Sequence, residues 1–226
     1  MIETHKKTDL AFDEENYIAT VFEDSFTIST EKKLKIKDIA KKTADISAYF
    51  FEYLKEYQIP SAFHSKESEN SLKFFKHVEY NFRIKILNRS DKRNAKIFNL
   101  KEGQDLGLPI IEFHYGFGKE SVICESHLIS FNLCAAEDLK LITRICSKIN
   151  AVLKSFFERR NEILAEISLT FGKVDDKIYL TGDFSPASLK ILPVDQSKKW
   201  VNPYKLSTAN EIKKYTDHLY NITSIK

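Results

Sequence analysis

Residues 176–195 carry the kinds of side chain that could bind a nucleotide or a metal ion, and they read DKIYLTGDFSPASLKILPVD. A β-rich run at 177–180 is followed by a turn and then by the acid Asp183. The cation Lys190 lies four residues beyond the proline of the same segment. An acid and a base projected from the end of one strand are what such a site requires, so this segment is the first candidate for chemistry.

Composition is typical of a globular protein. The chain has 226 residues, 42% of them hydrophobic, which suffices for one large domain or two small lobes with a real core. Lys and Arg number 35 against 32 for Asp and Glu, so the net charge is +3. This near balance predicts that neither nucleic acid nor an anionic membrane is the main partner.

The number of cysteines and the length of the apolar runs indicate the cellular compartment of the protein. The three cysteines at 124, 134 and 146 are too few and too widely spaced for a zinc knuckle or a disulfide framework. They predict a reduced, cytoplasmic compartment and structural rather than chemical roles. No apolar run approaches the roughly 18 residues that a membrane span needs, and the first residues lack a signal-peptide core.

Glycine is scarce, with six in the chain and none before Gly103. Loops that cradle phosphates use glycine so that their backbone can approach the ligand, and neither GxGxxG nor GxxxxGK[ST] occurs here. We therefore expect weak or absent ATP binding.

Hydrophobic periodicity predicts an α+β fold with antiparallel sheets and packed helices. We expect two lobes, a smaller one over 1–78 and a larger one over 79–226. The predicted elements are a hairpin at 17–30, a helix at 37–57 closed by Pro60, a polar loop at 65–71, strands at 72–76 and 79–88, a polar turn at 88–94, a strand at 108–115, a helix from 136 to about 164, paired strands at 165–171 and 177–181 around Gly172-Lys173, and a helix at 209–220 with Ser207 or Thr208 as N-cap.

Six pieces in this order resemble the SAICAR synthetase family, whose members join aspartate to a carboxylated aminoimidazole ribotide using ATP. The likeness runs from about residue 17 to 220. The pieces are ISAYFFEYLKEYQIPSAF (46–63), similar to a family helix followed by "GIPT"; LNRSDKRNAKIFNLKEG (87–103), similar to "RN…GS…R…EEG"; LPIIEFHY (108–115), similar to "PIVEFYY"; ICESHL (123–128), similar to "INEDHI"; INAVLKSFFERRNEIL (149–164), similar to "INEVLKEFF…GIIL"; and DFSP, similar to "DEISPD".

The resemblance implies a two-lobed fold and specific chemical needs. ATP would be held by a basic, glycine-containing start and by Mg²⁺ on carboxylates, and the ribotide phosphate by Arg and Ser. At most of these places the chain differs from the family pattern. The glycine-containing start has no counterpart at 4–10, the "KG…NN" before the first helix is lost, and the replacements elsewhere are Leu87 for an arginine, Lys92-Arg93 for "GS", Ser168 for a lysine, Thr170, Gly182 and Ala187 for acids, and Lys190 for an arginine.

Several family positions keep a suitable side chain. The resemblance implies substrate-binding roles for Asn88, Glu125, His127 and Ser185. Each also has an ordinary interpretation: Asn88 as a turn cap, Glu125 with His127 as a surface pair beside the Ser126 hydroxyl, and Ser185 with Pro186 as a turn and helix-start signal.

The acids and the cation of the candidate site are predicted to bind metal and to take part in catalysis. We expect Glu166 and Asp183 to hold one Mg²⁺ with waters if they share a cleft. We expect Asp183 and Lys190 to be the catalytic pair if the reaction survives. The ordinary interpretation of Lys190 is a solvated lysine, which cannot replace arginine in bidentate binding.

Two functions stay open. In the first, the chain has lost the ligase reaction and serves as a binding or regulatory subunit, alone, as a homo-oligomer or with an intact paralogue, with a phosphate-bearing small molecule as its ligand. In the second, it is a divergent ATP-dependent ligase, and ATP with Mg²⁺ are its cofactors. The simultaneous loss of several charged groups favours the first, because one such group can be worth about 10²–10³ in rate.

Overall fold

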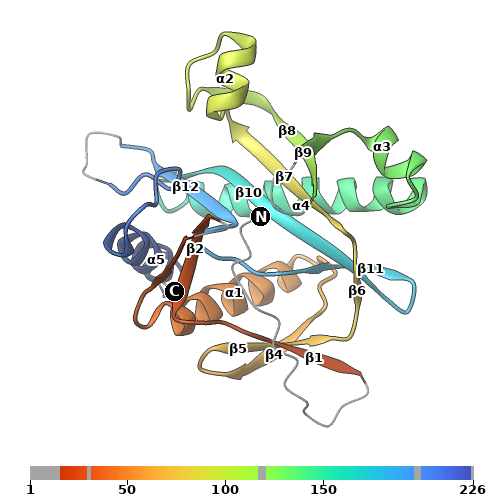
Figure 1. Cartoon of the computed structure of the whole chain (residues 1–226), viewed down its shortest axis with the longest axis horizontal. Coiled ribbons are helices and arrows are strands. Elements are labelled where there is room, and N and C mark those ends of the chain that lie inside the picture. The colour runs from red at the N-terminus through yellow and green to blue at the C-terminus, as the bar shows by residue number, and fades with distance from the viewer. Residues whose placement is uncertain (1–15, 30–31, 117–120, 196–199, 225–226) are drawn as a thin grey trace.

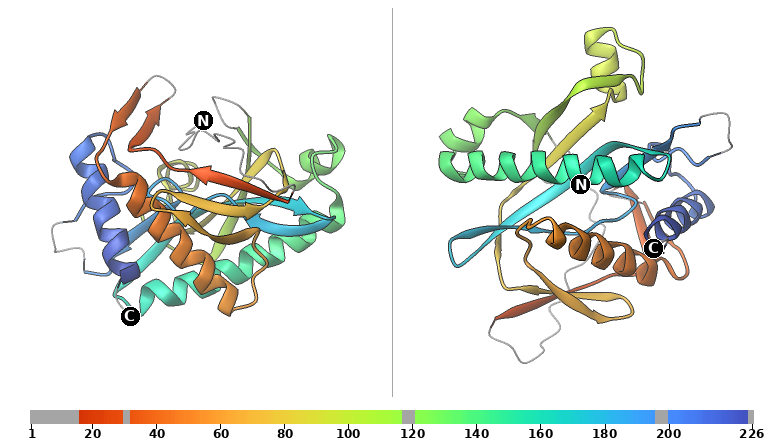
Figure 2. Two further views of the ribbon diagram at one scale, coloured as in Figure 1. Left: turned by 90° about the horizontal axis from the view of Figure 1, so that it is seen from below. Right: turned by 180° about the vertical axis from the view of Figure 1, so that it is seen from behind.

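A sheet of seven antiparallel strands lies at the centre of the molecule, with helices α1, α4 and α5 around it (Figures 1 and 2). The computed structural model describes residues 16–29, 32–116, 121–195 and 200–224. The helices are α1 (Ile39–Glu56), α2 (Lys92–Phe98), α3 (Glu125–Ser130), α4 (Ala136–Glu158) and α5 (Ala209–Ser224). The strands are β1 (Tyr17–Val21), β2 (Ser25–Ser29), β3 (Lys32–Lys35), β4 (Phe63–Ser68), β5 (Ser71–Phe75), β6 (Val78–Glu79), β7 (Phe82–Arg89), β8 (Asp105–Tyr115), β9 (Ser121–Ile123), β10 (Glu162–Val174), β11 (Lys177–Thr181) and β12 (Leu189–Pro193).

The large sheet has the order β11-β10-β7-β8-β9, and β12 and β6 also pair with β10. Helix α4 packs on one face of this sheet, as the view from behind shows (Figure 2). Its apolar stripe, which includes Ile142, Ile149 and Leu153, shares one buried cluster with Ile84 and Ile86 of β7. A helix from 136 packed on the larger sheet was predicted, and the antiparallel α+β fold is confirmed.

A smaller sheet of order β1-β5-β4 lies against helix α1. The ring of Phe51 on α1 stacks on Phe63 of β4 at 5.0 Å and meets Phe74 of β5 edge-on at 5.5 Å. The buried cluster continues from this layer into the large sheet without interruption. The division into lobes at residue 78 stays a prediction.

The predicted hairpin at 17–30 is wrong. Strand β1 pairs with β5, and β2 pairs with β3, so the chain crosses from one sheet to another instead of turning back. Asp24 fixes this crossing, because its carboxylate accepts from the Ala40 N–H at 3.0 Å and its carbonyl from the Ile36 N–H at 2.8 Å. The polar residues at 23–25 form a corner between two sheets, although they have the composition of a hairpin turn.

Three boundaries also differ from the predictions. The polar stretch 65–71 is mostly strand β4, because its polar side chains lie at the exposed edge of the small sheet. The stretch 88–94 contains the end of β7 and the start of α2, where Asp91 caps the helix through the Asn94 N–H at 2.7 Å. The long helix ends at Glu158, and Asn161 adopts a left-handed conformation (φ 57°) before β10 begins.

The turn between β10 and β11 lies at Asp175 and Asp176, both with positive φ, and not at Gly172. Gly172 lies inside β10, where a Cβ would come within 2.9 Å of the His77 ring and 3.0 Å of the Val78 carbonyl oxygen. The glycine therefore permits a close approach to β6. Helix α5 begins as predicted, since the Thr208 hydroxyl accepts from the Glu211 N–H at 3.3 Å. No helix among the described residues is long and apolar enough to span a membrane.

Candidate functional site

The candidate site lies on the face of the large sheet opposite α4, which is turned toward the viewer in Figure 1. Strand β7 alternates between the two faces, so Ile84, Ile86 and Asn88 lie toward α4. Arg83 and Lys85 lie on the other face. The alternation was visible in the sequence, but it did not show which side chains lie opposite them on neighbouring strands.

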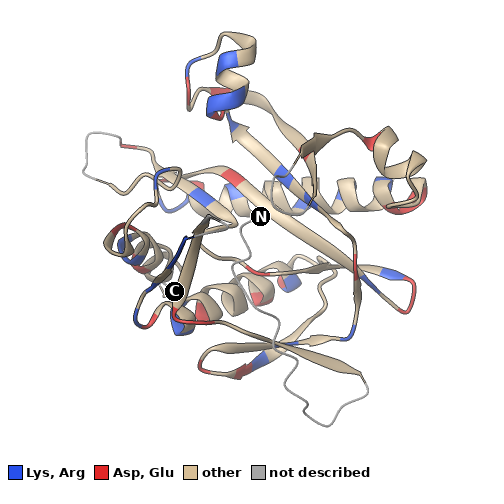
Figure 3. Cartoon of the chain, in the orientation of Figure 1, with Lys and Arg blue, Asp and Glu red and all other residues tan. Residues whose placement is uncertain are grey.

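Strand register brings two charged pairs onto one face of the sheet, in neighbouring rows. Lys85 of β7 lies opposite Glu112 of β8, and Glu166 of β10 lies opposite Lys190 of β12. Since cross-strand partners point to the same face, these four side chains share the face opposite α4. We call Glu112, Lys85, Glu166 and Lys190 the charged strip. Figure 3 shows basic positions on β7 and an acidic position near the start of β10.

Glu166 is a buried acid at the centre of the charged strip. Its side chain is 7% exposed, and its Oε1 lies 3.4 Å from Nζ of Lys85. Lys190 lies directly across on β12, and its charge interaction with Glu166 favours the ammonium form. The predicted metal ligand Glu166 therefore has a lysine on each side.

Lys190 is a half-buried lysine rather than a solvated one. Its Nζ donates to the Pro186 carbonyl oxygen at 2.8 Å. Burial lowers its pKa to about 8; the carboxylate of Glu166 opposes this shift, and the positive charges of Lys85 and Arg83 add to it. The ammonium is therefore held inside the structure, close to the turn that carries Asp183.

The turn at 183–188 is closed by its own hydrogen bonds. The Ser188 hydroxyl accepts from the Ser185 N–H at 2.8 Å and donates to the Asp183 carbonyl at 3.0 Å. The Ser185 hydroxyl accepts from the Ala187 N–H at 3.2 Å, and Ser185 is 2% exposed. The Ser185 side chain thus shapes this turn, which agrees with the ordinary interpretation of the Ser-Pro pair.

A residue that the sequence did not single out anchors the turn to helix α1. The Ser47 hydroxyl donates to the Phe184 carbonyl at 2.9 Å and accepts from the Phe184 N–H at 3.0 Å. The ring of Phe184 packs between Phe50 and Phe51 of α1. Asp183 is therefore placed by helix α1 and by the turn together. No pattern within one strand or helix predicts such a contact.

At the β8 end of the strip, Glu112 is buried in a polar cluster. Its carboxylate accepts hydrogen bonds from Arg93, from Asn94 at 3.1 Å and from His114 at 3.1 Å. Burial raises the pKa of Glu112, but the hydrogen bonds from His114 and Asn94 and the charge of Arg93 outweigh it and hold the pKa below its usual value. Glu112 is therefore an ionised acid already matched by basic and amide groups.

Asn88 lies on the α4 side of the sheet, away from the charged strip. Its side-chain amide exchanges two hydrogen bonds with that of Asn150 on α4, at 2.8 and 2.9 Å. The turn-cap interpretation is wrong, because Asn88 lies within β7. Its predicted role in substrate binding stays a prediction, and the structure gives it a partner in the core.

Glu125 and His127 lie on α3, beyond the edge strand β9 (Figure 1). Both are exposed. The His127 ring accepts from the Cys124 N–H through Nδ1 at 3.2 Å, and the same nitrogen lies 3.0 Å from the Cys124 sulfur. The predicted substrate contacts of Glu125 and His127 stay predictions.

The acids of the charged strip are the side chains that would have to hold the magnesium ion that the resemblance implies. Among the described residues no group of three or more His, Cys, Asp or Glu side chains could hold a metal. Glu166 has Lys85 and Lys190 beside it, and these ammonium groups would repel a divalent cation. The residues of the charged strip therefore do not fit Mg²⁺. The expected loss of the basic ATP-binding start at 4–10 lies outside the described residues.

Comparison with known proteins shows similarity along nearly the whole chain. The SAICAR synthetase family model matches residues 6–218. A phosphoribosylaminoimidazole-succinocarboxamide synthase from Clostridium novyi is 26% identical over 225 residues, covering 98% of this chain and 95% of that protein. One from Persephonella marina is 24% identical over 192 residues, covering 84% of this chain and 81% of that protein.

Solved structures show the same fold. The synthase from Ehrlichia chaffeensis superposes with a TM-score of 0.87 at 22% identity, covering 100% of both chains. A SAICAR synthetase in complex with ADP gives a TM-score of 0.84 at 22% identity, covering 94% of this chain and 93% of that one. The match of the family model over residues 6–218, together with this fold, shows that the chain belongs to the SAICAR synthetase family, which is linked to purine biosynthesis.

Proposed function

We propose that this member of the family has lost the ligase reaction and acts as a binding or regulatory subunit. The observation that carries the proposal is the charged strip. Glu112 is held by Arg93, Asn94 and His114, and Glu166 is held by Lys85 with Lys190 opposite. Carboxylates matched in this way are not available to a magnesium ion, and phosphoryl transfer depends on metal and cation positioning.

The turn around Asp183 supports the same conclusion. A Cβ at Gly182 would lie 2.3 Å from the Thr170 hydroxyl oxygen, so an acid at position 182 would need a change at Thr170 as well. The Thr181 hydroxyl also donates to the Thr170 hydroxyl at 3.2 Å. The three positions 170, 182 and 187, where the family pattern has acids, thus carry a threonine, a glycine and an alanine in a packed arrangement. Asp183 is then the one acid of the turn, too few to restore the missing charge.

The ligand class follows from the charges that remain. Arg83 and Lys85 alternate onto the face of β7 opposite α4, and Lys190 lies on the same face of β12. A cationic face of this kind attracts a phosphate-bearing small molecule without a metal ion. Three cysteines with no disulfide between them fit a cytoplasmic location. The chain would act as a homo-oligomer or with an intact paralogue.

A divergent active ligase is the second candidate, with Asp183 and Lys190 as its catalytic pair and ATP and Mg²⁺ as its cofactors. The observation that favours it is coverage: the relatives are named as synthases, and this chain spans most of their length. In that case the described strip would have to rearrange around Glu166 when nucleotide binds.

Calorimetric titration separates the two candidates at the level of binding. The chain would be titrated with Mg²⁺-ATP and, separately, with inorganic phosphate and a nucleoside monophosphate in the absence of metal. The proposal expects weak or no binding of Mg²⁺-ATP and measurable binding of a phosphate compound without metal. A dissociation constant for Mg²⁺-ATP in the low micromolar range would overturn it, and the Clostridium novyi synthase serves as the positive control.

A further inference from the structure

Two parts of the chain project from the large sheet and bury little of their own surface. We call residues 92–108, which contain α2 and the start of β8, the arm. We call residues 121–139, which contain β9, α3 and the start of α4, the knob. In Figure 1 the helix of the arm lies beyond the ends of β7 and β8, and the helix of the knob lies beyond the edge strand β9. Helix α2 buries only Asn94 and Ala95, and α3 buries only Leu128.

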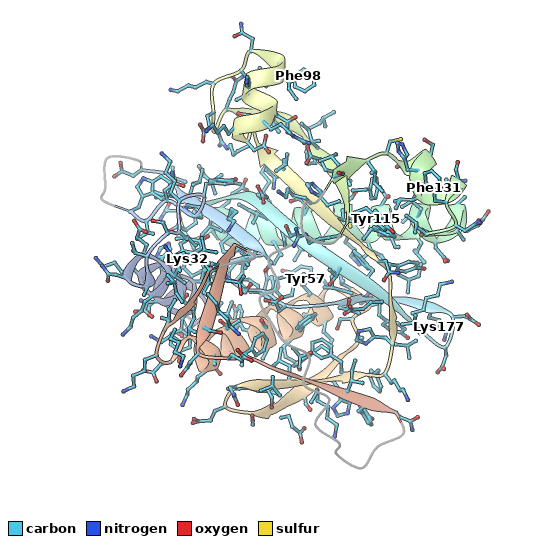
Figure 4. The ribbon with its side chains drawn as sticks, viewed as in Figure 1. Lys32, Tyr57, Phe98, Tyr115, Phe131 and Lys177 are labelled. Carbon is cyan, nitrogen blue, oxygen red and sulfur yellow. The ribbon has the colours of Figure 1, made fainter. Side chains whose placement is uncertain are left out.

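The arm and the knob expose large apolar side chains to solvent. Leu108 on the arm is 83% exposed, and Phe131 on the knob is 69% exposed. Figure 4 shows Phe98 and Phe131 on the outside of the molecule. Almost half of the thirteen exposed large apolar side chains in the described part of the chain lie here, namely Ile97, Phe98 and Leu108 on the arm and Val122, Ile129 and Phe131 on the knob. Such a concentration marks a surface that another molecule covers.

The two surfaces carry opposite charge. The arm contains four Lys and Arg residues against two acids, whereas the knob contains three acids and no Lys or Arg. Two of these charges are matched within the chain, Arg93 by a carboxylate of β8 and Asp138 by Lys173 at 2.7 Å. Lys96 on the arm and Glu137 on the knob are exposed. A cationic apolar surface and an acidic apolar surface are complementary to each other.

The arm is held in one position by hydrogen bonds at its base. The Asp91 carboxylate caps α2 by accepting from the Asn94 N–H at 2.7 Å. The Asn94 amide donates to the Glu112 carboxylate of β8 at 3.1 Å, and the Ser90 hydroxyl donates to the Lys101 carbonyl at 2.6 Å. A surface fixed in this way loses little conformational entropy when a partner binds to it.

A second copy of this chain fits both surfaces at once. A twofold axis that places the arm of each copy on the knob of the other brings apolar side chains together and opposes cations with acids at two equivalent contacts. The arm has seventeen residues and the knob nineteen, compared with the roughly 20–30 residues a side of a standard interface. The contact closes on itself, so it yields a dimer and not a filament.

Strand β8 indicates that the copies meet through side chains and not by extending the sheet. Its pairing with β9 begins at Phe113, so the outer edge of 105–112 has no partner strand among the described residues. Pro109 lies on this edge and has no N–H to donate to another strand. The edge is therefore unsuited to continuous pairing with a second copy.

We propose that this chain forms a twofold dimer in which the arm of each copy covers the knob of the other. The dimer rests on the homo-oligomer of the proposed function and gives that homo-oligomer its surface. Oligomeric state is measured without ligand or substrate. A monomer would therefore leave the loss of the ligase reaction standing, and an active ligase would leave the dimer standing.

Light scattering and sedimentation of the full chain over a dilution series measure the dimer. We expect a dimer at about 20 µM chain, above the micromolar dissociation constants of weak specific interfaces. Phe98→Asp should raise the dissociation constant at least about 100-fold, because it replaces a buried ring by a charge at both contacts. Val194→Asp, at a 57% exposed apolar position elsewhere, is the matched control and should not change it. A monomeric wild-type chain at every concentration, or a Phe98→Asp dimer as tight as wild type, would overturn the proposal.

Charge reversal tests which surfaces meet. Lys96→Glu and Glu137→Lys should each weaken the dimer by roughly tenfold, because like charges then face each other at both contacts. An equal mixture of the two variants should recover the wild-type dissociation constant, since each arm then meets a knob of opposite sign. Urea midpoints equal to wild type establish that both variants are folded. Folded variants that stay monomeric when mixed would show that arm and knob do not meet, and would refute the proposed dimer.

Discussion

The two faces of the large sheet differ in the side chains that they carry. The face under α4 is a continuous apolar cluster that includes Ile86, Ile149 and Leu153. The opposite face carries the charged strip, in which each acid is matched by a neighbouring cation. The first face maintains the family fold, and the second carries the charges on which the proposed function rests. The comparison teaches that fold and chemistry are encoded on opposite sides of the same strands.

The largest effect is expected on the apolar face. Leu153→Ala would remove a fully buried side chain from α4 and should lower the free energy of unfolding by about 2–5 kcal/mol. Urea denaturation measures this change. Leu141→Ala is the matched control, because Leu141 lies on the same helix and is 41% exposed. Equal losses in both variants would refute the packing of α4 described above.

A smaller loss is expected on the charged face. Glu166→Gln would remove the carboxylate between Lys85 and Lys190 and leave two ammonium groups side by side. We expect a loss of roughly 1–3 kcal/mol, less than for a fully buried pair because Lys85 is partly exposed. Glu69→Gln breaks the exposed pair with Lys41 and should leave stability almost unchanged. A Glu166→Gln variant as stable as wild type would show that the Glu166 carboxylate does not stabilise the fold through Lys85 and Lys190.

The next prediction concerns pH. The pKa of Lys190 falls from 10.5 to about 8 in the folded chain, mainly because of burial. Between these values the unfolded chain binds more protons than the folded one, so this group makes stability rise with pH in that window. Lys190→Met should remove that rise. Urea midpoints of both proteins, measured at intervals from pH 7.5 to 10, test the difference; parallel curves would contradict the low pKa.

The smallest effect is expected from restoring single family residues. Gly182→Asp and Lys190→Arg should each leave ligase activity undetectable, because the other acids at 170 and 187 are still missing. Groups that act together in catalysis do not contribute additively. Activity in either single variant would show that one residue separates this chain from a working ligase.

Local patterns predicted most of the fold. The 3.6-residue period identified α1 and α4, the N-cap signal at 207–208 identified α5, and alternation identified β7. These patterns gave wrong element boundaries at two places where the local residue types are typical of another structure. The corner at 23–25 has turn residues, and Ile163 and Leu164 extend the apolar stripe of α4 although they lie in β10. At both places, contacts with residues distant in the sequence determine the local structure.

The site was less predictable for a related reason. Asp183 and Lys190 were singled out as an acid and a base near the end of one strand, and Glu166 because the resemblance implies an acid there. Lys85 was not, since its importance comes from the register of β7 against β8 and β10. Ser47 and the Cys124–His127 contact were missed for the same reason: strand register and loop packing cannot be obtained from one sequence.

The central claim is that the ligase reaction is lost, and an activity assay tests it most directly. The unmodified chain would be mixed with aspartate, ATP, Mg²⁺ and the carboxylated aminoimidazole ribotide, with the Clostridium novyi synthase as positive control. We predict no product above background under conditions in which the control turns over. Turnover near 1 s⁻¹ or faster, within the usual enzyme range of roughly 1–10³ s⁻¹, would contradict the claim and establish the divergent ligase.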